Sequence, residues 1–284
     1  MNLAFAKMHG IGNDFVLVDH LAHGAPSVDV VQEAARFLCD RHFGIGADGV
    51  LSVLPPDAPD TDFAYRMFNP DGSEAEMCGN GIRCFGKWVR DAGHTDADRI
   101  RVGTKAGIKV LDLVLDGTSV AAVRVDMGRP GLLRTDLPME GPDGEVLDEP
   151  IAVDGTSVRI TGVSMGNPHI AYFVDTATDA SIDRLGPLLE RHPAFPRRTN
   201  VHEVEQVGPD TLRMLTWERG AGRTLACGTG ACAVAVAGHR LGRTGRSVVC
   251  QLPGGDLSIH WDEATGHVHM TGPAAMVFTG TIAW

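Results

Sequence analysis

The sequence has few cysteines, no long apolar run and no concentration of positive charge. Six cysteines in 284 residues are too few for a disulfide scaffold and favour reduced thiols in a cytoplasm. No apolar run approaches the ~18–20 residues of a membrane-spanning helix, and the N-terminal residues lack the apolar core and cleavage site of a secretory leader. A net charge of −11 without a basic run argues against nucleic acid and anionic membrane surfaces as partners.

The composition is otherwise that of a soluble globular protein, with 43% hydrophobic and 21% charged residues. The length allows one large domain or two of about 140 residues. Four landmarks recur in order at a spacing of about 150 residues, which indicates two homologous halves. They are Gly12-Asn13 with Gly166-Asn167, Arg41-His42 with Arg191-His192, Cys78-Gly-x-Gly with Cys227-Gly-x-Gly, and Gly107–Val110 with Gly255–Ser258.

Hydrophobic periodicity predicts an α/β protein in which short strands alternate with two helices in each half. Helices are expected at Gln32–Arg41, Gly81–Asp91, Ile182–His192 and Gly230–Leu241. Strands are expected at Leu17–Asp19, Gly49–Leu54, Phe63–Phe68, Ile100–Val102, Ile108–Leu115, Val120–Val125, Val158–Val163, His169–Val174, Val201–Gln206, Thr211–Thr216, Val248–Leu252, Leu257–Trp261, Val268–Thr271 and Ala275–Phe278. The last helix is apolar on almost every face and is expected in a core wrapped by sheet.

The domain boundary is expected within 124–130, where Gly128 and Pro130 interrupt the strand pattern. We expect a first domain at 1–124, to which a strand at 273–284 returns, and a second domain at 125–272. The stretch 136–150, rich in Asp, Glu, Gly and Pro, is predicted to be an exposed loop.

Cys78 and Cys227 are the strongest candidates for chemistry, because each precedes Gly-x-Gly at the start of a predicted helix. Free N–H groups and the helix dipole at such a position favour a thiolate and can hold a carboxylate. Two such sites suggest a substrate gripped between opposed thiols, one accepting and the other donating a proton. The remaining cysteines are interpreted as packing residues. Neither the spacing of a zinc site nor a Cys-x-x-Cys redox pair is present.

Polar residues are placed symmetrically about these thiols. Asn69 and Glu218 stand at the same distance before Cys78 and Cys227, and each opens a loop that leads to the thiol. Such residues are often simple turn formers, but their repeated placement supports a role in binding. Glu218 and Arg219 together could bind the ammonium and carboxylate of a zwitterion. Further candidates are Asn13, Asn167, His169 and Asn200.

The segments Met8–Phe15, Phe68–Ser73, Cys78–Cys84, Met165–His169 and Glu218–Cys232 closely resemble diaminopimelate epimerase, in the right order along essentially the whole chain. The resemblance implies two pseudosymmetric α/β domains, each a curled sheet around a central helix, with the active site in the cleft between them. It implies interconversion of LL- and meso-2,6-diaminopimelate, for lysine and peptidoglycan synthesis, with no pyridoxal phosphate or metal. A cytoplasmic homodimer is expected, with diaminopimelate as the partner and neither nucleic acid nor membrane.

The resemblance also implies the roles of individual residues. Cys227 matches the base toward the LL isomer and Cys78 matches the acid, and the reverse reaction exchanges these roles. Gly79, Asn80, Gly228 and Thr229 match positions whose backbone N–H groups hold the carboxylate at the reacting centre. His169 and Glu218 match residues that tune the thiols. The substrate-binding positions are matched by Asn13, Asn69, Asn167, Asn200, Glu218 and Arg219.

Two positions depart from this family pattern. Some members carry Gln in the substrate pocket where this chain has Gly49, and some carry Tyr at a dimer contact where it has Phe278. Two alternatives remain open from the residues alone. One is a racemase for another amino acid, such as proline, hydroxyproline or histidine, which would share the two-thiol logic. The other is a catalytically silent amino-acid-binding or interaction protein on the same fold.

Overall fold

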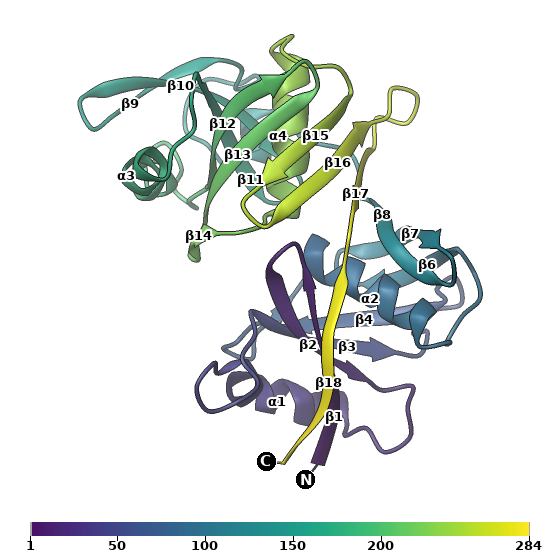
Figure 1. Ribbon diagram of the computed structural model, residues 1–284. Helices are drawn as coiled ribbons and strands as arrows, with labels where there is room; N and C mark the ends of the chain where they lie inside the picture. The colour runs from purple at the N-terminus through teal and green to yellow at the C-terminus, as the bar shows by residue number, and fades with distance from the viewer. Residues whose placement is uncertain (1, 284) are drawn as a thin grey trace. The chain divides into compact units, whose positions relative to one another are not determined.

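The computed structural model describes residues 2–283 and divides the chain into two compact units. Unit 1 combines the chain up to Val125 with the segment from Gly272 onward. Unit 2 runs from Asp126 to Thr271. In Figure 1 the yellow C-terminal strand β18 (Ala275–Ala283) lies beside the purple N-terminal strand β1 (Asn2–Gly10), so both ends of the chain belong to unit 1.

Unit 1 is a mostly antiparallel sheet in the order β18-β1-β2-β3-β4-β6-β7-β8, with the short β5 paired to the end of β4. Only β2–β3 and β4–β6 are parallel, and each of these pairs is joined through a helix. Such crossovers are what parallel neighbours require. The strands are β1 (Asn2–Gly10), β2 (Asn13–Asp19), β3 (Gly49–Leu54), β4 (Phe63–Phe68), β5 (Glu74–Ala75), β6 (Arg99–Thr104), β7 (Gly107–Asp116), β8 (Ser119–Asp126) and β18 (Ala275–Ala283).

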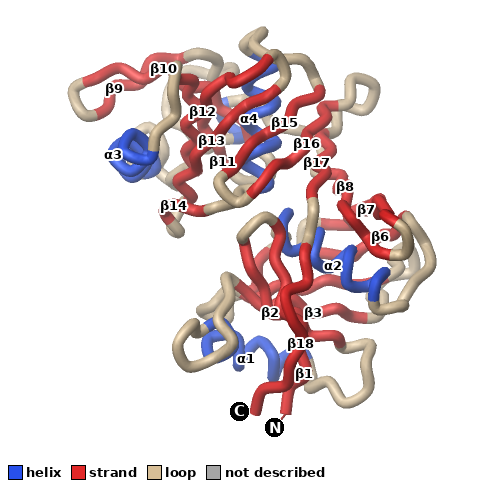
Figure 2. Tube along the Cα trace, in the orientation of Figure 1, coloured by secondary structure: helices blue, strands red, loops and turns tan. Residues whose placement is uncertain are grey.

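The two helices of unit 1 have different environments. Helix α1 (Val28–Cys39) buries Val31, Ala35 and Leu38 against β3 and leaves its other face to solvent, as expected of an amphipathic surface helix. Helix α2 (Gly79–Asp91) packs against β1, β2, β3, β4, β7 and β18. Figure 2 shows strands on several sides of α2, so the sheet curls around it.

Unit 2 repeats this topology strand for strand. The order is β9-β10-β11-β12-β13-β15-β16-β17, β14 pairs with β13, and the parallel pairs are β11–β12 and β13–β15. Helix α4 (Gly228–Arg240) occupies the place of α2, and α3 (Asp179–Glu190) that of α1. The strands are β9 (Glu149–Val153), β10 (Thr156–Ser164), β11 (Pro168–Val174), β12 (Asn200–Gly208), β13 (Thr211–Glu218), β14 (Gly222–Thr224), β15 (Ser247–Leu252), β16 (Gly255–Trp261) and β17 (Val268–Gly272).

The strand registers give residue-level equivalences between the units. Asn13 and Asn167 open the matching segments of the repeat, and Phe15 pairs with Gly49 as His169 pairs with Asn200. Phe15 is therefore the counterpart of His169. Two residues further along β3 and β12, Leu51 is the counterpart of His202. All four side chains are buried, so the same inward positions carry apolar groups in unit 1 and imidazoles in unit 2.

The α/β class and the helix-centred sheets are confirmed, and the bounds predicted for β3 and β4 are identical to those observed. Helix α4 is buried from Gly228 to Gly238 except at Thr229, as its apolar composition predicted. Helices α2 and α4 each begin two residues earlier than predicted. This makes Cys78 and Cys227 the N-cap residues themselves.

Some predictions were wrong. The stretch 136–150 is not simply an exposed loop, because Leu137 and Val146 are each 1% exposed and belong to the unit 2 core. Strand β1 was missed, and β18 continues to Ala283 rather than ending at Phe278. Helices α1 and α3 begin and end earlier than predicted, since Ser27 and Thr178 occupy their N-cap positions.

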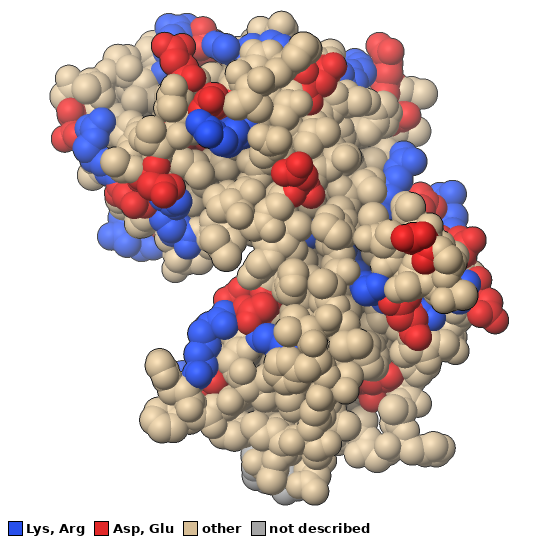
Figure 3. Space-filling view, viewed as in Figure 1, with Lys and Arg blue, Asp and Glu red and all other residues tan. Residues whose placement is uncertain are grey.

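No helix among the described residues is long and apolar enough to cross a membrane. On the face drawn in Figure 3, Lys and Arg side chains lie interspersed with Asp and Glu side chains. Ion pairs among the described residues include Arg223 with Asp179 and Asp183. Exposed pairs of this kind contribute little to stability.

Candidate active site

Each unit places one cysteine at the N-cap of its central helix. Cys78 and Cys227 both have extended backbone angles, and their carbonyls accept the first helical bonds, from Ile82 and Ala231, at 2.9 Å. Neither side chain forms a capping hydrogen bond of the usual geometry with its own helix. The residues that follow, Gly79-Asn80 and Gly228-Thr229, therefore present first-turn N–H groups, which suit a carboxylate.

In unit 1, the Asn13 side chain links the thiol to the rest of the site. Its Oδ1 accepts hydrogen bonds from Cys78 Sγ at 3.7 Å and from Asn80 Nδ2 at 3.2 Å. Its Nδ2 donates to Asp48 Oδ2 at 2.7 Å. The Asn13 nitrogen is thus occupied, and its oxygen is directed to the start of α2.

A charged network holds Asn13 in this orientation. Asp48 also accepts from the Asp14 backbone N–H and pairs with Arg41 at 2.9 Å. Arg41 in turn pairs with Asp14 at 2.6 Å, and Lys7 pairs with Asp14 from the other side. Although burial opposes it, the hydrogen bonds from Arg41 and Lys7 lower the pKa of Asp14 to about 2. Asp14 is therefore ionised at neutral pH.

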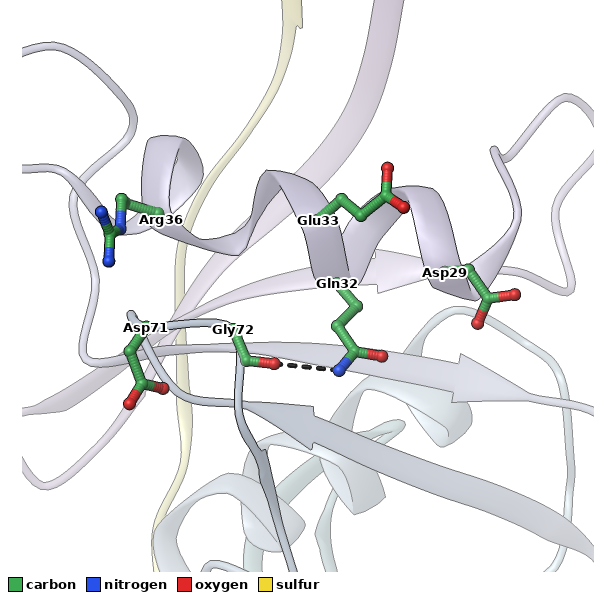
Figure 4. Close-up of a pocket in the computed structure, with 6 residues that line it drawn as sticks. All are labelled: Asp29, Gln32, Glu33, Arg36, Asp71 and Gly72. Atoms are coloured by element: carbon green, nitrogen blue, oxygen red, sulfur yellow. Dashed lines mark hydrogen bonds between the residues drawn. The ribbon is translucent and has the colours of Figure 1, made fainter.

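Asn69 lies at the end of β4 in a tight turn. Its Nδ2 donates to Ser73 Oγ at 3.0 Å, and its backbone N–H donates to the Ser73 carbonyl at 2.8 Å. Gln32 Nε2 on α1 donates to the Gly72 carbonyl at 2.9 Å and ties this turn to the helix, as Figure 4 shows. The open cavity of about 540 Å³ drawn there, lined by Asp29, Gln32, Glu33, Arg36, Asp71 and Gly72, contains none of the predicted site residues.

In unit 2, Cys227 is more enclosed than Cys78, with 4% of its surface exposed. Burial raises its pKa well above the usual range, and the Glu218 carboxylate raises it further. Thr229, whose Oγ1 lies 3.7 Å from the sulfur, and the Gly230 N–H act in the opposite direction. Glu218 is itself fixed by a 2.6 Å hydrogen bond from Thr224 Oγ1. A protonated Cys227 therefore has a carboxylate acceptor beside it.

Asn167, His169 and His202 form a line of hydrogen bonds next to Cys227. Asn167 Oδ1 lies 2.9 Å from His169 Nε2, and His169 Nδ1 lies 2.9 Å from His202 Nε2. His202 Nδ1 ends the line on Thr216 Oγ1 at 3.0 Å. Burial lowers the pKa of both imidazoles, to about 3 for His202 and well below 6.5 for His169. Both rings are therefore neutral at physiological pH.

Asn200 is the first residue of β12, and Arg219 directly follows the last residue of the neighbouring strand β13. Asn200 Nδ2 donates to the Pro168 carbonyl, and its Oδ1 accepts from the Arg219 backbone N–H, each at 2.9 Å. The loop after β13 is also held by Glu190 at the end of α3, which accepts from Trp217 Nε1 and the Gly220 N–H at 3.0 Å. Glu190 is 2% exposed and pairs with Arg198.

Four supporting residues were not identified from the sequence. Asp48 and Glu190 orient the predicted ligands, and His202 and Thr216 extend the line from Asn167. His202 lies in a run of five consecutive buried residues at the start of β12, so no polar–apolar alternation marked it as an inward side chain. Glu190 could have been suspected because it ends an amphipathic helix just before the repeated Arg-His pair.

The other four cysteines are buried, as their interpretation as packing residues requires. Burial raises the pKa of Cys39 to about 11 and of Cys84 and Cys250 to about 12. Within residues 2–283, no group of three or more His, Cys, Asp or Glu side chains could hold a metal ion.

The two departures from the family pattern have local explanations. At Gly49 a Cβ atom would lie 2.9 Å from Met67 Cε and 3.0 Å from the Phe68 carbonyl, so a side chain does not fit without movement. Phe278 stands on β18, where its ring packs edge-on against Phe5 at 5.9 Å and remains 47% exposed.

Comparison with known proteins identifies relatives along almost the whole chain. A family model described as diaminopimelate epimerase matches residues 5–133 and 161–277. A protein named diaminopimelate epimerase from Moorella thermoacetica is 52% identical over 276 residues, covering 97% of this chain and 98% of that protein. One of the same name from Synechocystis sp. is 48% identical over 282 residues, covering 99% of both.

Solved structures with similar folds are more distant in sequence. A hydroxyproline epimerase from Agrobacterium vitis with bound trans-4-hydroxy-L-proline has a TM-score of 0.71 at 18% identity, covering 99% of this chain and 92% of that one. A methylitaconate-delta-isomerase has a TM-score of 0.66 at 14% identity, covering 99% and 95%. These likenesses concern the fold alone. The extent and level of identity to the named relatives place this chain in the diaminopimelate epimerase family.

Proposed function

We propose that this protein interconverts LL- and meso-2,6-diaminopimelate by a two-thiol acid–base reaction that uses neither pyridoxal phosphate nor a metal. One observation carries the proposal: each unit bears a thiol at the N-cap of its central helix, in a chain about 50% identical to proteins named diaminopimelate epimerase. The pathways served would be lysine and peptidoglycan precursor synthesis.

In the direction from LL to meso, the Cys227 thiolate removes the α proton. The C–H bond breaks, an S–H bond forms on Cys227, and the electron pair remains on carbon. Cys78 then delivers its proton to the opposite face, so that its S–H bond breaks and a new C–H bond forms with inverted configuration. Each thiol ends in the protonation state from which the reverse reaction starts.

The α proton of an amino acid is very weakly acidic, so the site must stabilise the carbanion. First-turn N–H groups at Gly79-Asn80 and Gly228-Thr229 are fixed donors for the carboxylate attached to the reacting carbon. Positioned general acid–base groups contribute about 10²–10⁴ in rate. Electrostatics that are already in place and correct orientation supply the rest.

The environment of Cys227 suits a residue that exchanges its proton during turnover. Burial and Glu218 raise the pKa of this thiol, so its thiolate is a stronger base than a solvated one. Before the reaction starts, the thiol proton passes by way of Glu218 to solvent, so that Glu218 is ionised again and contributes to holding the distal ammonium of the substrate. We assign the remaining substrate contacts to Asn13, Asn69, Asn167, Asn200 and Arg219.

Purified protein with no added cofactor tests this function. We expect conversion of LL-diaminopimelate to the meso isomer, with no racemisation of proline, hydroxyproline or histidine in a parallel substrate panel. Racemisation of one of these instead would assign the thiols to another substrate. Binding of diaminopimelate in calorimetry without turnover would reduce the protein to a binding module.

We further propose that the protein acts as a homodimer in the cytoplasm. Met276, Val277 and Phe278 on β18 are about half exposed and form a continuous apolar segment on an edge of unit 1, which suits contact with a second copy. All six cysteines are free thiols, in keeping with a reducing compartment. Sedimentation of the wild-type protein against Phe278→Lys tests the dimer: we expect the substitution to yield monomers.

A further inference from the structure

We propose that His202 is a positioning residue that fixes, through His169, which end of the Asn167 amide is presented to the substrate. The inference rests on the proposed function, because it specifies how one of the proposed substrate contacts is made. The structural basis is the buried line of hydrogen bonds from Thr216 through His202 and His169 to Asn167.

The two imidazoles have no contact with solvent. His202 is 0% exposed and His169 is 1% exposed, and their rings stack with centroids 5.2 Å apart. Each ring nitrogen has a single partner in the line, at 2.9 to 3.0 Å. Rings held by both nitrogens in a close-packed interior have one orientation.

With Asn167 Oδ1 facing His169, the protons in this line can be arranged in one way when both rings are neutral. Asn167 Oδ1 is only an acceptor, so His169 Nε2 carries the proton and donates to it. His169 Nδ1 is then an acceptor, and His202 Nε2 must donate to it. His202 Nδ1 consequently accepts from the Thr216 hydroxyl. Both rings are neutral because burial disfavours the charged imidazole at each position and lowers the pKa of both residues.

The consequence for Asn167 is that its oxygen is occupied and its nitrogen is available. Among the described residues, Asn167 Nδ2 has no hydrogen-bond partner, and the residue is partly exposed. It therefore offers N–H donors, which match a carboxylate oxygen of the amino-acid substrate. An Asn167 free to rotate would also offer its carbonyl oxygen, which repels the same group.

His202 also contacts the helix start that carries the thiol. A Cβ atom added at Gly230 would lie 2.8 Å from His202 Nε2 and 3.0 Å from Cys227 Sγ, so ring and thiol flank one glycine. In unit 1 the counterpart of His202 is Leu51 and that of His169 is Phe15, both 0% exposed. A leucine at position 202 is thus a side chain that this fold already accommodates at the equivalent place.

The test compares three variants of the full chain in the epimerase assay. His202→Leu removes the donor to His169, and we expect KM for diaminopimelate to rise roughly tenfold, the effect of one lost hydrogen bond, with a smaller change in kcat. His202→Gln restores an N–H donor and should recover most of the loss. His20→Leu is the matched control. His20 directly follows the last residue of β2, at the end away from Asn13, and its ring lies 3.0 Å from Ser52 Oγ, so this substitution should leave KM unchanged.

A second measurement is independent of activity. Nitrogen-15 NMR of the histidine rings in wild-type protein should show His169 protonated at Nε2 and bare at Nδ1. Protonation of His169 at Nδ1 overturns the proposal even if His202→Leu fails to fold. An unchanged KM in folded His202→Leu also overturns it. If the wild type lacks epimerase activity, the proposed function fails, whereas the NMR result still decides the direction of the hydrogen bonds.

Discussion

Units 1 and 2 have the same strand order and the same thiol at the same helix cap, but they orient the pseudosymmetric asparagines by different means. In unit 1, a network of ion pairs around Asp48 holds the Asn13 nitrogen and leaves the oxygen beside Cys78. In unit 2, neutral imidazoles hold the Asn167 oxygen and leave the nitrogen available. The two equivalent asparagines are therefore held by opposite ends of the side-chain amide, Asn13 by its nitrogen and Asn167 by its oxygen.

The contrast follows from where each supporting group lies. Asp48, Arg41 and Asp14 are at least partly exposed, so charges there remain solvated. His169 and His202 occupy inward positions filled in unit 1 by Phe15 and Leu51, where an uncompensated charge would be costly. Neutral rings bonded at both nitrogens meet that constraint.

The largest expected effect comes from removing either thiol. Cys78→Ser and Cys227→Ser should each lower kcat by at least about 10²–10⁴, because both proton transfers need a positioned sulfur. Circular dichroism should show an intact fold. Cys250→Ala is the matched control: this buried thiol donates to the Ala231 carbonyl at 3.6 Å, so its loss should affect stability and not kcat. Near-normal turnover in either serine variant would disprove the two-thiol scheme.

Because Asn13 and Asn167 are held by opposite ends of their amides, an Asn→Asp substitution should have different effects at the two positions. Asn167→Asp keeps the acceptor for His169 but replaces the available donor by a carboxylate, so KM should rise by roughly 10- to 100-fold with stability nearly unchanged. Asn13→Asp instead places a carboxylate where Nδ2 donates to Asp48 at 2.7 Å. Urea unfolding should show a loss of about 1–3 kcal/mol for this variant. Identical effects of the two substitutions would remove the distinction between the units.

The glycine at the third position of each helix sharpens the comparison further. A Cβ at Gly81 would lie 2.8 Å from Tyr65 Oη and 3.0 Å from Leu51, whereas one at Gly230 would lie 2.3 Å from the His202 ring. Overpacking of this kind typically costs about 1–3 kcal/mol. We expect both Gly→Ala variants to unfold at lower urea concentration, with the greater loss for Gly230→Ala. A smaller loss at Gly230 than at Gly81 would contradict the geometry.

The smallest effect concerns pH. The folded-state pKa of His202 is about 3, against 6.5 in the unfolded chain, and that of His169 is also lowered. Below pH 6.5 the unfolded chain takes up these protons and the folded protein does not, so stability should fall as pH decreases from 6.5 toward 3. His202→Leu should weaken this dependence, measured as the slope of unfolding free energy between pH 6.5 and 5. An unaltered slope would mean that His202 is not held neutral.

Much of the fold could be predicted from the sequence, because the repeat and the strand periodicity are local signals. Strand β1 was not, since Asn2–Gly10 gains its partners β2 and β18 from both ends of the chain. The helix starts at Cys78 and Cys227 were recognisable from Gly-x-Gly. His202 and Glu190 were not, because their roles depend on neighbours that only the tertiary structure brings together.

Isotope labelling tests most directly whether two thiols serve one carbon. In deuterated water, over the first few per cent of conversion, meso product should carry deuterium at the inverted carbon while recovered LL substrate carries none. Substrate is re-formed when Cys227 returns the proton that it removed, so recovered substrate keeps that proton. Product forms when Cys78 delivers a deuteron that it has taken from the solvent. Deuterium appearing in recovered substrate as fast as in product, or product that retains the original proton, would contradict the account.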